Sequence, residues 1–166
     1  MGQVCRNEKN YYYWLFPFAW MSIIFYASAQ PYEKQDIKPM LSQTVDLSFL
    51  EPFLGWIDFS YNHSRVSLEA LGTNGVIEFF IRKGAHFAAF FILLVLFYLA
   101  FRKTVTWGAL RLVTVSFSLT IAYAIMDELH QGLTPNRTPY IGDVFIDGFG
   151  AITACMFLLF LKNKRK

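Results

Sequence analysis

Four apolar segments constrain this chain of 166 residues more than any other feature. A helix needs about 20 mainly apolar residues to cross the hydrocarbon core of a bilayer, and these segments reach or approach that length. They run over Tyr11–Ala29, Phe79–Phe101, Ala109–Leu129 and Val144–Leu161. Hydrophobic residues make up 55% of the chain and charged residues only 16%, on the membrane side of ordinary globular usage. The sequence therefore predicts an all-α integral membrane protein with four transmembrane helices, forming one domain over residues 1–166.

The first segment has a second interpretation, as a cleaved signal peptide, because Ala27-Ser28-Ala29 resembles a signal-peptidase site. Its aromatic start and Pro17 do not fit the leucine-type core of such a signal. Tyr and Trp rings also settle at membrane interfaces, which suits the start of a spanning helix. We therefore expect a retained helix.

A long connection over residues 31–77 joins the first two segments and is not polar throughout. Five of its apolar residues recur at helical spacing: Phe49, Leu50, Phe53, Leu54 and Ile57. This spacing predicts an amphipathic helix that lies along the interface or dips into the membrane. A second short helix is expected over Val66–Leu71, ending at Gly72. The connection is then either a lid packed on the bundle or a lid over a lipid- or glycan-facing groove.

The distribution of basic residues predicts the orientation. More Lys and Arg flank the two termini and the short loop over residues 102–108 than flank the other side of the membrane. The positive-inside rule then puts both termini in the cytoplasm and the long connection outside the cell. Although the net charge is +3, the basic residues are scattered over short flanks, so we expect no nucleic-acid partner.

Polar and ionisable side chains gather at the ends of the apolar segments. Eight of them form the predicted binding site: Lys83, His86, Asp127, Glu128, Gln131, Arg137, Asp143 and Asp147. Their spacings of three or four residues put Lys83 with His86, Asp127 with Gln131, and Asp143 with Asp147 on shared helix faces. The predicted topology places all of these groups near the outer surface. We expect them to meet in one outward-facing polar pocket.

The same residues resemble a known family. The matching strings are Ser28-Ala29-Gln30-Pro31, Lys83-Gly84-Ala85-His86-Phe87, Asp127-Glu128-Leu129-His130-Gln131, Pro135-Asn136-Arg137, and Asp143 followed by Asp147-Gly148-Phe149-Gly150-Ala151. Together they resemble the VanZ-like membrane proteins, the teicoplanin-resistance protein family. The resemblance implies a bacterial, Gram-positive plasma membrane and a role in low-level resistance to teicoplanin-type glycopeptides. One position departs from the pattern: Ala89 stands where family members often carry Glu.

Structural interpretations compete with functional ones at several positions. Asp143 is placed to cap the last helix, and Lys83 with Arg82 can extend to the lipid headgroups. Small residues predict close helix packing at Gly148, Gly150 and Ala151, and also at Gly84, Ala85, Ala88 and Ala89. The pocket groups can likewise be structural ion pairs. However, buried ion pairs stabilise weakly, which favours a function for so many of them.

Three classes of function follow. In the first, basic groups bind a phosphate or carboxylate while carboxylates and Gln131 hold sugar hydroxyls, so that the pocket recognises a lipid-linked cell-wall precursor or a lipoglycopeptide at the outer leaflet. In the second, Asp127 or Glu128 with His86 performs acid–base or metal-assisted catalysis on a phosphorylated lipid or cell-wall precursor. The third, transport, is disfavoured because the polar groups cluster at one boundary. No H-E-x-x-H spacing is present, so we expect no resident metal or cofactor, and recognition without catalysis is preferred.

Overall fold

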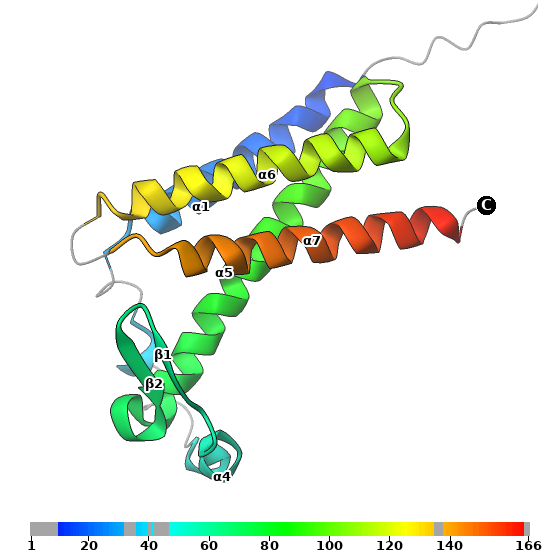
Figure 1. Ribbon diagram of the computed structural model, residues 1–166. Helices are drawn as coiled ribbons and strands as arrows, with labels where there is room; N and C mark the ends of the chain where they lie inside the picture. Colours follow the sequence, from blue (N-terminus) through cyan, green and yellow to red (C-terminus); the bar gives the residue numbers. More distant parts are fainter. Residues whose placement is uncertain (1–9, 32–35, 40, 42–46, 135–137, 165–166) are drawn as a thin grey trace, which may run out of the picture.

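The computed structural model describes residues 10–31, 36–39, 41, 47–134 and 138–164. A 3-10 turn, η1 (Tyr11–Trp14), leads into helix α1 (Leu15–Ser28), and the long connection contains η2 (Ser48–Leu50) and α4 (Glu51–Leu54). A two-stranded antiparallel hairpin follows, with β1 (Asp58–Tyr61) paired to β2 (Ser64–Ser67). Three long helices complete the chain: α5 (Leu68–Thr104), α6 (Ala109–Gln131) and α7 (Ile141–Asn163). Figure 1 shows α5 crossing behind α6 and α7 and continuing beyond them to the hairpin.

Three helices in the described part of the chain are long and apolar enough to cross a bilayer: α5, α6 and α7. Their exposed side chains include many large apolar groups, as lipid contact requires. These helices support the predicted class, an α-helical membrane protein. Helix α1 has only 14 residues and is not among the three, so the expected fourth span is not shown.

Helix α5 lies against each of the other long helices, and its contact with α7 is the closest. Ala151 and Ala154 of α7 are completely buried, in an apolar cluster with residues of α5 and α6. A Cβ atom built on Gly150 would lie 2.2 Å from the carbonyl oxygen of Phe87. Only glycine therefore permits this approach of the two backbones, which agrees with the packing role expected for small residues of the last helix.

The connection follows the expected amphipathic helix only in part. Among its described residues, helical structure occurs at residues 38–39 and 41 and then in η2 and α4, which hold four of the five expected residues, and the chain then enters the hairpin before Ile57 can extend the helix. Ile57 is buried with Val66 and Val76, in a small apolar cluster between the hairpin and α5. Leu54 packs against the same cluster, whereas Phe49 and Phe53 remain exposed, so the segment buries only part of its predicted apolar face.

The span labelled α5 begins at Leu68 and contains two helical parts, a short first part and a long helix that begins after Gly72, earlier than the predicted Phe79. The Ser67 side chain caps the first part by accepting a hydrogen bond from the Ala70 amide at 3.2 Å. Gly72 then adopts φ = 67°, a left-handed conformation that interrupts the helix at the position where the sequence predicted a stop. The first turn is thus set off from the long membrane helix.

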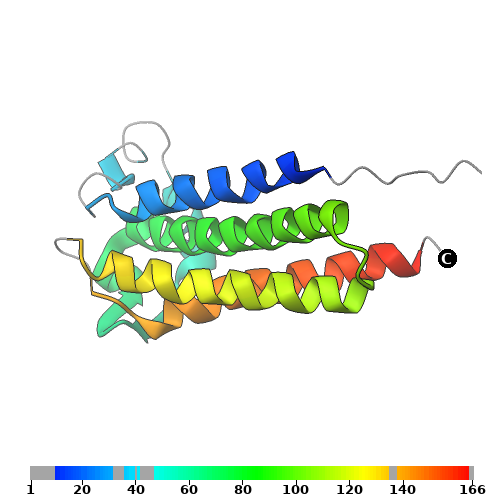
Figure 2. The same ribbon diagram turned by 90° about the horizontal axis from the view of Figure 1, so that it is seen from above.

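The two ends of the helix bundle contain different parts of the chain. Figure 2 shows the start of α1 and the end of α7 at one end, while the hairpin and the α6–α7 connection lie at the other. At this second end, Asn62 of the hairpin turn donates a hydrogen bond of 3.1 Å to Thr138, in the connection between α6 and α7. The predicted polar residues of α5, α6 and α7 belong to this second end.

Candidate functional site

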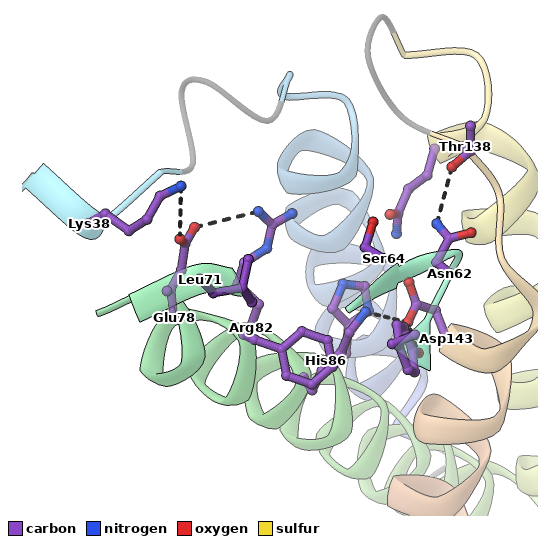
Figure 3. Close-up of a pocket in the computed structure, with 14 residues that line it drawn as sticks. Lys38, Asn62, Ser64, Leu71, Glu78, Arg82, His86, Thr138 and Asp143 are labelled. Atoms are coloured by element: carbon purple, nitrogen blue, oxygen red, sulfur yellow. Dashed lines mark hydrogen bonds and ion pairs between the residues drawn. The ribbon is translucent and has the colours of Figure 1, made fainter. Parts of the chain in front are cut away.

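A cavity of about 300 Å³ opens at the hairpin end of the bundle. Its lining comes from the connection, the hairpin, the first half of α5, and the facing ends of α6 and α7 (Figure 3). The polar lining residues are Lys38, Tyr61, Asn62, Ser64, Glu78, Arg82, Lys83, His86, Gln131, Thr138 and Asp143. The size lies at the lower end of the range for small-molecule sites.

Asp143 is the junction between hairpin and helices. Its carboxylate accepts hydrogen bonds from the Lys83 ammonium and the Tyr61 hydroxyl. The Lys83 nitrogen also lies 4.6 Å from the centre of the Tyr61 ring, within the range of a cation–π contact. Partial burial, and then the bond to Asp143, raise the pKa of Tyr61 above its ordinary value. The phenol therefore remains protonated and continues to donate to the carboxylate.

His86 and Asp147 form a second pair, about one helical turn beyond Lys83 on α5 and beyond Asp143 on α7. The Nδ1 atom of His86 lies 3.2 Å from Oδ1 of Asp147, whose side chain is almost completely buried. A carboxylate on one ring nitrogen orients an imidazole and leaves the other nitrogen for a ligand or a proton. His86 is partly exposed and lines the cavity, so the pair presents an oriented imidazole to it.

A buried polar network behind the cavity joins α6 to α1. Ser28 donates to Asp127 at 2.9 Å, and Gln131 donates to the same oxygen at 3.0 Å. Thr134 adds a longer bond to the Ser28 carbonyl at 3.4 Å. The other carboxylate oxygen of Asp127 has no hydrogen-bond partner among the described residues. This network attaches the end of α1 to the site and holds the Gln131 side chain at the cavity wall.

Glu128 has a structural contact of its own. One of its oxygens accepts a hydrogen bond from the backbone amide of Tyr140, at the start of α7. The other oxygen is buried without a hydrogen-bond partner in the described part of the chain. Glu128 therefore links the end of α6 to the start of α7 and does not line the cavity.

The eight predicted site residues divide into three groups. Four line the cavity: Lys83, His86, Gln131 and Asp143. Three are buried behind it and contact these residues or their helices: Asp127, Glu128 and Asp147. The last, Arg137, lies outside the described residues, as do Pro135 and Asn136 of the same motif.

Two structural interpretations of the sequence need correction. Asp143 does not cap α7, because the helix begins at Ile141 and the Asp143 side chain is occupied by Lys83 and Tyr61. The small residues of α5 also behave differently from those of α7. Ala85 and Ala88 are exposed, and nothing lies within 4 Å of a Cβ atom on Gly84, so these positions are not closed by helix packing.

Sequence reasoning missed several lining residues, of which Glu78 and Tyr61 matter most. Glu78 is 2% exposed, and its carboxylate lies 3.7 Å from Arg82 and 3.9 Å from Lys38. Its four-residue spacing from Arg82 was the available signal. Tyr61 was missed with the whole hairpin. The signal there was alternating apolar residues around Asn62, which takes a positive φ in the turn.

The arrangement is suited to binding an anion that carries hydroxyl groups. Ammonium and guanidinium groups make charge-assisted hydrogen bonds to phosphate, and amide and hydroxyl side chains pair with sugars. Among the described residues, no three His, Cys, Asp or Glu side chains are placed to hold a metal ion.

Fold and site together define the class: an α-helical membrane protein with a polar cavity at one end of its helices. A profile described as VanZ/LLP1 matches residues 13–162. The match covers nearly the whole chain, so the protein belongs to the VanZ/LLP1 family, and the resemblance noted in its motifs is confirmed. A comparison with curated proteins found no match, and a comparison with solved structures also found none.

Proposed function

We propose that this chain is a cell-envelope membrane protein whose polar cavity recognises the anionic, hydroxyl-bearing part of a lipid-linked envelope component. In this role it lowers susceptibility to teicoplanin-type glycopeptides. The single observation that carries the proposal is the lining of the cavity. Lys83 and Arg82 lie beside neutral donors and acceptors from the hairpin and the helix ends, such as Asn62 and Thr138.

The proposed topology has four spans. α1 follows the helical turn η1 without a break, and its Trp20 and Ser28 side chains bond to α5 and α6. This attachment supports α1 as the fourth membrane helix despite its short length. With the termini in the cytoplasm, the cavity would face the outside of a bacterial plasma membrane.

Binding of glucose 1-phosphate to the purified full-length chain in lipid nanodiscs tests the recognition step. Lys83→Met should weaken binding about tenfold or more, because a charge-assisted contact is lost. Lys103→Met is the matched control, since Lys103 is an exposed lysine near the opposite end of the same helix. Equal affinities of wild type and Lys83→Met, with both proteins folded, would contradict the proposal.

Susceptibility measurements test the cellular role. A sensitive Gram-positive host would be compared with no protein, the wild type, and Lys83→Ala, His86→Ala or Asp147→Asn at matched membrane abundance. We expect protection against teicoplanin from the wild type and loss of it in the variants. Equal susceptibility with and without the wild-type chain would remove resistance from the proposal and leave the recognition step to the binding test.

One observation favours a second candidate function, acid–base catalysis on the same phosphorylated ligand. The His86–Asp147 pair has the form of an oriented imidazole beside a binding cavity. Hydrolysis of the probe glucose 1-phosphate by water would then give glucose and inorganic phosphate. Phosphate release that is lost in His86→Gln would support this candidate, while tight binding without release would support recognition alone.

A further inference from the structure

A second cavity, of about 410 Å³, lies between α1 and α5 and is almost entirely apolar. We call it the α1–α5 groove. Its lining residues are Trp20, Ile23, Ile24, Ala27, Ser28, Arg82, Ala85, His86, Ala88, Ala89, Phe90 and Ile92. The groove therefore runs along two helices at membrane depth and offers a hydrocarbon-like wall.

The groove and the polar cavity share two lining residues, Arg82 and His86. These residues are one helical turn apart on α5, and Figure 3 shows both side chains beside the polar cavity. A molecule that extends from the cavity into the groove would pass a guanidinium and an imidazole and then meet apolar side chains, with Ser28 as the one other polar residue in the lining. That order of chemistry matches an anionic lipid, with a phosphate between its polar headgroup and its hydrocarbon chain.

The shape of the groove follows from residue size. On α5 the wall is made by Ala85, Ala88 and Ala89, which leave space beside the helix. On α1, the Trp20 indole N–H donates to the Ala89 carbonyl at 2.9 Å. The large indole bridges the two helices and keeps them apart, so the space between them stays open. An extended chain fits such a channel better than a compact group does.

We infer that the α1–α5 groove binds the hydrocarbon chain of the same lipid whose anionic headgroup occupies the polar cavity. This inference rests on the proposed function and adds a chain-binding site to it. The ligand class is then a single-chain lipid phosphate that bears a sugar. Arg82 contacts the phosphate at the junction, Lys83 and the hairpin contact the headgroup, and the alanine face of α5 contacts the chain.

The first test compares two probes that differ only in the chain: glucose 1-phosphate and its decyl phosphodiester, with neutral decyl glucoside to correct for partition into lipid. The diester should bind the full-length chain about tenfold tighter or more, because apolar surface is buried. Ala88→Phe should fill the groove, remove this advantage, and leave binding of glucose 1-phosphate unchanged. Ala122→Phe is the matched control, on an exposed position of α6.

The second test locates the chain. Trp20 is kept as the only tryptophan, with Trp14, Trp56 and Trp107 replaced by Phe, and the decyl chain of the diester is dibrominated. We expect saturable quenching of Trp20 that excess glucose 1-phosphate reverses, because both probes compete for the cavity. Equal quenching by the dibrominated neutral glucoside would mean that bulk lipid fills the groove. Absence of quenching by either brominated probe would mean that a second copy or another protein covers it, and each of these results overturns the inference.

The two proposals fail differently. If wild-type protein binds neither probe, the proposed recognition function is wrong and the inference falls with it. If glucose 1-phosphate binds, but the decyl chain adds nothing and Ala88→Phe changes nothing, only the inference is wrong.

Discussion

Small residues occur in the contacts of α5 with two helices, α7 and α1, and only the contact with α7 is closely packed. Toward α7, the backbone of Phe87 touches Gly150, and Ala151 and Ala154 are completely buried. Toward α1, the small residues belong to α5 itself, and Ala85 and Ala88 remain exposed along a groove. Small residues therefore permit close packing but do not cause it. The partner helix decides whether the space is filled by backbone or left open.

The reason lies in how each partner is attached. α7 presents small residues where it meets the α5 backbone, so the two helices approach fully. α1 is held to α5 by the long Trp20 side chain, which donates to the Ala89 carbonyl, and to α6 by the hydrogen bond from Tyr123 to the Met21 carbonyl at 2.6 Å. The Trp20 indole is the spacer between α1 and α5. The tight contact supplies rigidity, and the spaced contact leaves room for a ligand.

The largest expected effect comes from adding one methyl group to each side. Gly150→Ala should destabilise the protein by about 1–3 kcal/mol, because the new Cβ would overlap the Phe87 carbonyl. Gly84→Ala, at an exposed position of α5 where nothing lies within 4 Å of the added Cβ, should be neutral or stabilise by up to about 1 kcal/mol through helix propensity. Unfolding of both variants in mixed micelles checks the pair. Similar stabilities of the Gly150→Ala and Gly84→Ala variants would contradict the proposed difference between the packed and the open positions.

A second test concerns the buried end of α1. Ser28→Ala should cost about 1–3 kcal/mol, because the buried Asp127 carboxylate loses a donor. Ser22→Ala, on the exposed side of the same helix, should change stability by no more than about 0.5 kcal/mol. The same unfolding measurement applies. If Ser28→Ala were as mild as its control, α1 would not depend on this anchor.

The spacer itself can be shortened. Trp20→Phe removes the hydrogen bond to Ala89 and should destabilise the protein by about 1 kcal/mol. It should also bring α1 closer to α5, which spin-label distances between the helices would detect. Trp56→Phe is the control, because Trp56 is 81% exposed. An unchanged distance in Trp20→Phe would show that the indole is not what keeps the groove open.

The smallest effect concerns the hairpin that borders the polar cavity. Two hydrogen bonds of 2.8 Å from the Arg65 guanidinium lower the pKa of Asp58. Because the folded pKa is depressed, this contribution is present above about pH 4 and is lost as pH falls through the lower folded value. Both groups are exposed, so the effect is weak and screened by salt. Relative to the intrinsic exchange rate at each pH, the protection of the hairpin amides should fall at acidic pH, and fall less in Asp58→Asn.

Part of the polar site was predictable because the spacing of its residues is local. Residues three or four apart share a helix face in any fold, so Lys83 with His86 and Asp143 with Asp147 could be assigned to common surfaces. The structure indeed joins these two faces through the Lys83–Asp143 and His86–Asp147 contacts. The hairpin side of the site was not predictable in this way. Tyr61 reaches Asp143 across 82 positions of the sequence, and only a turn with two positive φ angles puts it there.

The sequence by itself determined the α-helical membrane class, the family and four of the polar residues that line the cavity, since segment length, motif order and helical spacing are local properties. Tertiary structure alone decided which of those residues face the cavity and which, like Asp127 and Asp147, are buried behind it. It also decided that the alanines of α5 border a groove and the glycine of α7 touches a backbone. The physical reason is that packing depends on which side chains of the facing helix lie opposite a residue, and the sequence next to that residue does not specify them.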